Sequence, residues 1–156
     1  MANVVDEVGK WFFEEYFASY VRSLRGEHEA GPEFLLDYWS VPVRLSAPGF
    51  AAWLLADEDV VGFHRDFDRV QAQGQGFADT VVRDRKVVGY HADAAGVDLL
   101  FSRLRADGSE IGRFAAHYEV GRDARGWRVF SVQTAPTAAE SLADAWERSS
   151  TSCQFS

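Results

Sequence analysis

The pattern of apolar residues changes at Gly76, and this change constrains the fold more than any other feature of the chain. Before Gly76 the apolar residues recur at the spacing of an α-helix, and after it they form β-rich runs closed by short turn sequences. The runs are Phe77–His91, Val97–Arg105, Glu110–Gly121 and Trp127–Thr134. Helices followed by consecutive strands predict an α+β domain with helices on one face of an antiparallel sheet. We therefore expect a small-molecule cavity between the helices and the sheet.

Length and composition favour one folded domain, residues 1–136, followed by a tail, residues 137–156. The chain has 156 residues, of which 47% are hydrophobic, so it can bury a sizeable core. Thr137–Glu140 resembles a helix-capping sequence and predicts a short helix that ends near Trp146. The polar stretch Ser149–Ser156 is expected to be frayed.

Charge and residue usage argue against several classes of function. A net charge of −8 without a Lys/Arg cluster makes nucleic acids and anionic membranes poor partners. The four histidines have no metal-binding spacing, and the single cysteine, Cys153, cannot form an internal disulfide. No glycine-rich phosphate loop is present, so no cofactor is expected. The sequence shows no secretion signal and no membrane-spanning segment, and we therefore expect a soluble cytoplasmic protein.

Three helices are predicted before the strands. The first begins near Val5 and ends near Gly26, because its apolar side chains fall on one wide arc. The second is short and begins at Gly31-Pro32-Glu33, since proline suits the first position of a helix. The third begins at the acidic residues 57–59, which complement the helix dipole, and ends in the glycine-rich stretch that closes at Gly76.

The third helix is predicted to have one apolar face and one solvated face. The apolar face at helical spacing consists of Val60, Phe63, His64, Phe67 and Val70. Asp66 and Asp68 are assigned to the solvated face, because a run of charges on a helix usually faces water.

Two short segments precede the third helix. Val41–Leu45 predicts a short strand, and Pro42 confines it to the edge of the sheet because proline cannot donate a ladder hydrogen bond. Phe50–Leu55 is compatible with either a strand or a helix.

Alternation along the strands predicts which side of the sheet faces the helices. In the third run the inner face consists of Phe114, Ala116, Tyr118 and Val120, and the outer face of Arg113, Ala115, His117 and Glu119. The second run carries apolar residues on both faces. Because one helical layer covers only one face, we expect a homodimer that forms through the outer face.

The order of these elements resembles the nuclear-transport-factor-two-like superfamily, which includes SnoaL-like polyketide cyclases, ketosteroid isomerases and scytalone dehydratases. The resemblance covers roughly residues 8–134. It is carried by Tyr20-Val21 on the first helix, by the segment 37–42, by the acid-capped third helix and by the end of the strands at 126–129. It implies a cone-shaped domain with about four long strands and a short edge strand, whose concave face is covered by three N-terminal helices.

The resemblance transfers to few individual residues. Tyr20 resembles the tyrosine that donates to the developing enolate in ketosteroid isomerases. The general-base aspartate of those enzymes lies in a strand before a proline, and the matching stretch 45–48 has Ala47 at that place. This departure favours a role other than steroid isomerisation by that base.

His64 is the candidate for proton transfer, because it lies on the apolar arc and an imidazole titrates near neutral pH. The alternative is a hydrogen-bonded core histidine. The tyrosines Tyr16, Tyr20, Tyr38 and Tyr118 are expected to converge on the pocket, where phenol groups would donate to a carbonyl or enolate oxygen. The alternative for each of them is an ordinary core aromatic.

Trp53 and Phe67 are expected to line the pocket and to contact an apolar ligand. Arg103 alternates with apolar residues along its strand and is open to two interpretations, an anion contact in the pocket or a cross-strand ion pair. The leading hypothesis is a cofactor-free isomerase, cyclase or dehydratase that acts on a small hydrophobic carbonyl compound, with His64 and Tyr20 as catalytic residues. The alternative is a non-catalytic ligand-binding domain or dimeric scaffold of the same fold.

Overall fold

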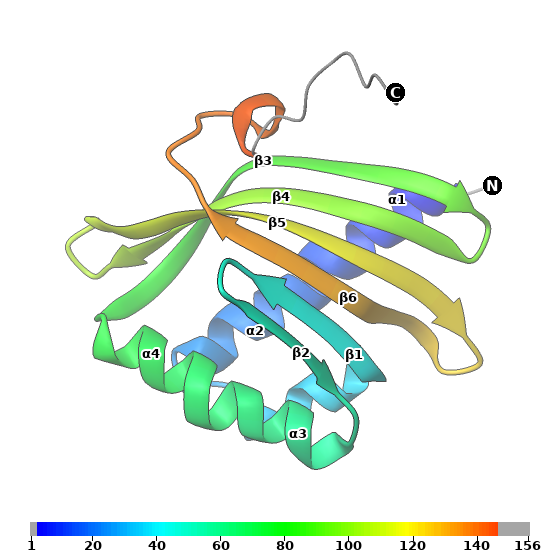
Figure 1. Cartoon of the computed structure of the whole chain (residues 1–156), viewed down its shortest axis with the longest axis horizontal. Coiled ribbons are helices and arrows are strands. Elements are labelled where there is room, and N and C mark those ends of the chain that lie inside the picture. Colours follow the sequence, from blue (N-terminus) through cyan, green and yellow to red (C-terminus); the bar gives the residue numbers. More distant parts are fainter. Residues whose placement is uncertain (1–2, 147–156) are drawn as a thin grey trace, which may run out of the picture.

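A computed structural model describes residues 3–146 and contains one six-stranded sheet with helices on one face (Figure 1). The strand order is β2-β1-β6-β5-β4-β3. The predicted stretch Ser149–Ser156 and Cys153 lie outside the described residues. None of the helices within the described range is long and apolar enough to cross a membrane.

The first helix is continuous but changes its winding twice. It comprises α1 (Val4–Lys10), the π-helical segment η1 (Trp11–Tyr16) and α2 (Phe17–Leu24). Asn3 caps its start, because the Asn3 side-chain oxygen accepts a hydrogen bond from the Asp6 amide at 2.9 Å. The predicted extent of this helix is confirmed.

The third helix changes its winding in the same way as the first, whereas the second helix does not. The second is the short 3₁₀ helix η2 (Gly31–Asp37). The third comprises α3 (Asp57–Gly62), the π-helical segment η3 (Phe63–Asp68) and α4 (Arg69–Gly74). Within it, the Asp59 carboxylate accepts the Ala56 amide at 3.1 Å and so satisfies a free donor at the helix start.

The four predicted β-runs form consecutive antiparallel strands, as predicted. They are β3 (Phe77–His91), β4 (Ala94–Arg105), β5 (Glu110–Asp123) and β6 (Gly126–Pro136). The sheet nevertheless has six strands and is mixed, because β1 (Trp39–Ala47) pairs in parallel with β6 and antiparallel with β2 (Phe50–Leu54). The segment Phe50–Leu55, which the sequence left open between strand and helix, therefore contains the edge strand β2 next to β1.

The prediction that Pro42 confines its strand to the edge was wrong. β1 lies between β2 and β6, but the pairing of β1 with β6 shifts in register between Trp39 and Arg44. Pairing with β2 begins only at Val43. Pro42 thus lies at an irregularity where no neighbouring strand requires its missing amide hydrogen.

The main core lies between the helices and the inner face of the sheet. Tyr118 and Val120 of β5 are buried there with helix residues such as Phe12 and Tyr16, which confirms the predicted inner face. On the outer face, Leu100 and Ala115 form a small second cluster with Ala145. The chain's own C-terminal segment therefore covers part of the outer face, and the homodimer through that face stays a prediction for light scattering to test.

The C-terminal segment differs from the predicted short helix. Only one 3₁₀ turn, η4 (Leu142–Asp144), is present between Thr137 and Trp146. The Leu142 amide donates to Asp84 at 2.9 Å, and the Arg113 guanidinium donates to the Ala139 carbonyl at 2.8 Å. These contacts to the sheet use backbone groups that a helix would have paired internally.

Candidate functional site

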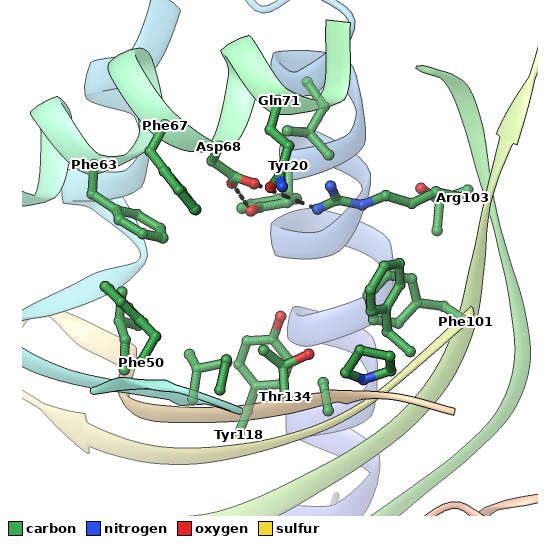
Figure 2. A pocket seen from close by; sticks show the side chains of 18 of the residues that line it. Tyr20, Phe50, Phe63, Phe67, Asp68, Gln71, Phe101, Arg103, Tyr118 and Thr134 are labelled. Carbon is green, nitrogen blue, oxygen red and sulfur yellow. Dashed lines mark hydrogen bonds and ion pairs between the residues drawn. The ribbon is translucent and has the colours of Figure 1, made fainter. Parts of the chain in front are cut away.

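A cavity of about 480 Å³ lies between the inner face of the sheet and the third helix (Figure 2). Aromatic rings make up much of its wall. The lining residues are Phe17, Tyr20, Leu24, Trp39, Leu45, Ala47, Pro48, Phe50, Phe63, Phe67, Asp68, Gln71, Gln75, Thr80, Phe101, Arg103, Phe114, Ala116, Tyr118, Val132, Thr134 and Pro136. A volume of this size is in the usual range for a small-molecule site.

The polar centre of the cavity is the carboxyl group of Asp68, which is only 7% exposed. One of its oxygens, Oδ2, accepts hydrogen bonds from the Tyr20 hydroxyl and from His64 Nδ1, the latter at 3.1 Å. The other oxygen, Oδ1, lies 3.5 Å from Nη2 of Arg103. Donors from two helices and one strand therefore converge on one carboxyl group.

The structure corrects the predicted faces of the third helix. Asp68 is buried, whereas Phe67 and Val70 are 54% and 61% exposed. The reason is the π-helical segment η3, whose wider turn changes which side chains point inward from the order expected at regular helical spacing. A signal was present in the sequence, since Asp68 follows His64 by one turn and such pairs share a helix face.

His64 is fully buried and does not line the cavity. Burial, together with the positive charges of Arg69 and Arg103, lowers its pKa from 6.5 to about 3. The ring is therefore neutral at neutral pH. Because a carboxylate only accepts hydrogen bonds, Nδ1 carries the proton, and Nε2 accepts from the Ser23 hydroxyl at 2.7 Å.

The pKa of Asp68 is shifted upward. Burial is the main cause, and the charge and hydrogen bond of Arg103 partly oppose it. The carboxyl group thus holds a proton at higher pH than an exposed aspartate does. Its position in a cavity wall makes this shift relevant to chemistry.

Two of the four predicted tyrosines line the cavity, and all four lie in one aromatic cluster. Tyr20 and Tyr118 contribute to the wall. Tyr16 lies behind them, with ring centroids 6.0 Å from Tyr20, 5.5 Å from Tyr38 and 6.0 Å from Tyr118. The four rings thus gather around Tyr16, which is fully buried, and neither Tyr16 nor Tyr38 lines the cavity as the sequence predicted.

Tyr118 packs against a buried tyrosine that is itself hydrogen-bonded. Trp39 Nε1 donates to the Tyr16 hydroxyl at 3.0 Å, and the rings of Tyr16 and Tyr118 meet edge to face. Burial raises the pKa of Tyr118 to about 12, so this phenol stays protonated at neutral pH. A protonated phenol carries one hydrogen that it can donate, so Tyr118 can act as a donor to a ligand in the cavity.

Trp53 was predicted to line the pocket, and this prediction was wrong. Trp53 lies at the surface with 60% of its area exposed, and the Arg44 guanidinium lies 5.6 Å from its ring.

Phe67, also predicted to line the pocket, does line the cavity. It stacks on Phe50 and Phe63 with centroid distances of 6.3 Å and 5.5 Å, and these rings form one side of the cavity (Figure 2). Sequence reasoning missed Phe50 because its segment had no assigned structure.

Within residues 3–146 no group of three or more His, Cys, Asp or Glu side chains is placed to hold a metal ion. The polar lining consists instead of one acid, one guanidinium, and hydroxyl and amide groups. Gln71 and Thr134 lie on opposite sides of the cavity in Figure 2. The site is therefore suited to hydrogen bonding and proton transfer around a mostly apolar molecule.

Solved structures with the same fold include proteins from several bacteria. A Nostoc punctiforme protein of unknown function with a cystatin-like fold is 17% identical, with a TM-score of 0.63 over 89% of this chain and 97% of its own. A candidate ketosteroid isomerase from Parabacteroides distasonis is 7% identical, with a TM-score of 0.59 over 87% of this chain and 89% of its own. None of the curated proteins matches the chain. A model of the family described as NTF2-like protein (DUF6841) matches residues 6–137, and the chain belongs to this NTF2-like family.

Proposed function

We propose that the chain binds a small, mostly apolar carbonyl compound and that Asp68 exchanges a proton with it, without a cofactor. The observation that carries this proposal is a nearly buried carboxyl group in the wall of a largely aromatic cavity. Burial raises the pKa of Asp68 toward the pH at which a general acid or base works efficiently.

His64 and Tyr20 act in this proposal as positioning residues. Both donate to the same oxygen of Asp68, and His64 has no access to the cavity. The Ser23 hydroxyl fixes the ring of His64 from the other side. This arrangement leaves proton transfer to Asp68, where the sequence had indicated His64.

Tyr118 is the proposed donor to the carbonyl oxygen. Its side chain rises from the sheet on the side of the cavity opposite Asp68 (Figure 2). A ligand between the two would present its carbonyl oxygen to the Tyr118 hydroxyl and an α-carbon to the carboxylate. Such a donor stabilises the negative charge that develops on the oxygen when the α-proton leaves.

The proposed step is enolisation. The Asp68 carboxylate takes a proton from the α-carbon, the C–H electron pair forms the enolate, and Tyr118 donates to the enolate oxygen. Return of the proton to a different carbon gives an isomer. If the ligand has a β-hydroxyl group, its departure with the same proton gives water and an unsaturated carbonyl compound, which is a dehydration.

The test is exchange of the α-protons of 1-tetralone, a bicyclic ketone, for deuterium in D₂O, followed by NMR. We expect protein-dependent exchange that falls about 10²–10⁴-fold in Asp68→Asn and about 10²–10³-fold in Tyr118→Phe. Asp66→Asn is the matched control, because Asp66 is an exposed acid on the same helix that pairs with Arg65 outside the cavity. Equal exchange by wild type and Asp68→Asn would reject the proposed chemistry.

A second function, ligand capture without turnover, is favoured by Ala47. This residue lines the cavity at the place where the resemblance would expect a catalytic aspartate. Binding of 1-tetralone without protein-dependent exchange would support this second function.

A further inference from the structure

We propose that the natural ligand of this cavity carries a carboxylate, and that Arg103 binds it. The inference rests on the proposed function in that it concerns the same cavity, and it adds the chemical class of the ligand: a small aromatic or alicyclic carboxylic acid.

Arg103 has donors that the protein does not use. Within the described part of the chain, its guanidinium makes one hydrogen bond, from Nη2 to Asp68 at 3.5 Å. Charge-assisted contacts of this kind are normally much shorter. The Nε atom is fully buried and has no acceptor among the described residues. A guanidinium presents its donors as a planar fork that matches the two oxygens of a carboxylate.

The surroundings of Arg103 make unused donors costly. The side chain is only 13% exposed, and its guanidinium lies 5.9 Å from the ring of Phe77 and 5.7 Å from that of Phe114. Such aromatic faces attract the cation but accept no strong hydrogen bonds. A nearly buried cation with few hydrogen bonds is in an unfavourable state, so an anionic ligand that accepts hydrogen bonds from the Nη groups of Arg103 stabilises it.

Asp68 does not fill this role in the free protein. Its Oδ2 oxygen is taken by Tyr20 and His64, and only the long contact from Oδ1 reaches Arg103. Asp68 and Arg103 are the charged residues among those that line the cavity. The guanidinium is therefore the group in this wall that can pair with an added negative charge.

The rest of the cavity fits the remainder of such a ligand. The Arg103 guanidinium lies beside Tyr20 and Gln71 at one end of the cavity (Figure 2). Phe50, Phe63 and Phe101 border the remaining space and offer ring surfaces to an apolar body. The neutral amide of Gln71 lines the same end of the cavity and can also hydrogen-bond to a ligand.

Long-range attraction cannot produce this preference, because the chain has a net charge of −8 and repels anions at a distance. If the protein prefers a carboxylate over a neutral analogue, the cause must therefore lie in local contacts within the cavity. The probe is 2-naphthoate, compared with its neutral analogue 2-naphthamide, at neutral pH by isothermal titration calorimetry. We expect 2-naphthoate to bind about 10–100-fold more tightly, the gain of hydrogen bonds to a charged group.

Variants locate the effect. Arg103→Gln should abolish the preference for 2-naphthoate while 2-naphthamide still binds, and Arg103→Lys should keep a reduced preference because it keeps the charge without the fork. Arg85→Gln is the matched control, since Arg85 is an exposed arginine on β3 that stacks on Phe13 away from the cavity. The control should bind both probes as the wild type does. If Arg103→Gln does not fold, the wild-type ratio and Arg103→Lys still decide.

The two proposals fail in different ways. Equal affinity of wild type for 2-naphthoate and 2-naphthamide, or an unchanged preference in the Arg103 variants, overturns the carboxylate inference and leaves exchange of 1-tetralone protons untouched. Equal exchange of 1-tetralone protons by wild type and Asp68→Asn, together with an Arg103-dependent preference for 2-naphthoate, overturns the proposed chemistry and retains the ligand class.

Discussion

Nδ1 of His64 lies 3.1 Å from Oδ2 of Asp68, one turn further along the same π-helical segment. The pKa shifts of the two groups have opposite directions, and both follow from burial. The neutral ring donates its one hydrogen to the carboxyl group, so the pair is held in a single orientation. Segments of π-helix often occur at functional sites, and here the segment brings both side chains inward.

This relationship predicts how stability depends on pH. The pKa of His64 is about 3 in the folded protein and 6.5 in the unfolded chain, so the unfolded state binds more protons between these values. The contribution of the neutral His64 ring to the free energy of unfolding is therefore complete above pH 6.5, decreases as the pH falls, and is lost near pH 3. The raised pKa of Asp68 acts in the opposite direction, since there the folded state holds the proton more tightly.

His64→Gln should flatten this dependence. Between pH 6.5 and pH 4 the free energy of unfolding, measured by urea denaturation, should fall by about 2–4 kcal/mol less in His64→Gln than in the wild type, because glutamine does not titrate. The slope with pH is compared rather than the absolute stability, which also reflects packing. His28→Gln is the control, since His28 is only partly buried and lies in the loop after the first helix. If the free energy of unfolding of His64→Gln depends on pH as steeply as that of the wild type, groups other than His64 cause the dependence and the prediction is wrong.

The aromatic side of the cavity predicts a separable effect on binding. Phe67 is 54% exposed yet stacks on Phe50, with 7° between the ring planes. Phe67→Ala should weaken binding of 2-naphthoate about 3–10-fold, since a stacked aromatic contact contributes roughly 0.5–1.5 kcal/mol. Val70→Ala is the control, because Val70 is similarly exposed on the same helix but does not line the cavity. Thermal melts of both variants should stay near the wild-type melt, and equal affinities would exclude Phe67 from the binding surface.

The long strands could be predicted because each is marked twice, by alternating side chains and by a turn sequence at its end. Asp107-Gly108 is such a turn, with the glycine at φ 85°, a conformation that side chains other than glycine rarely adopt. The place of β1 could not be predicted in this way. Pro42 indicated an edge, and only the register shift against β6 shows how an inner strand accommodates it.

The candidate site was predictable in its aromatic part and not in its charged part. Tyr20 and Tyr118 follow from regular helix and strand periods, and both line the cavity. Asp68 was assigned to solvent because a run of charges on a helix usually faces water, and its place one turn after His64 was the one signal of its burial. The contact between Asp68 and Arg103 joins residues 35 positions apart in the chain, and such a pair is defined only by the packing of the helix on the sheet.

The hydrogen bond from Tyr20 to Asp68 gives the last prediction. Tyr20→Phe keeps the ring and its contact with His64 at 5.3 Å but removes one donor to the carboxylate. Loss of a donor to the charged form raises the pKa of Asp68 further. The pH at which 1-tetralone exchange reaches half its maximum should therefore move upward, because the base form of Asp68 appears at higher pH.

The cost to stability should be about 1–3 kcal/mol at neutral pH, the range for a hydrogen bond to a charged group. Tyr90→Phe is the matched control, since Tyr90 is half exposed on β3 and does not line the cavity. If Asp68 is the proton carrier, the midpoint shifts in Tyr20→Phe and stays in place in Tyr90→Phe. A lower exchange rate with an unmoved midpoint would mean that Tyr20 acts on the ligand directly, as the resemblance to ketosteroid isomerases implies, and not through Asp68.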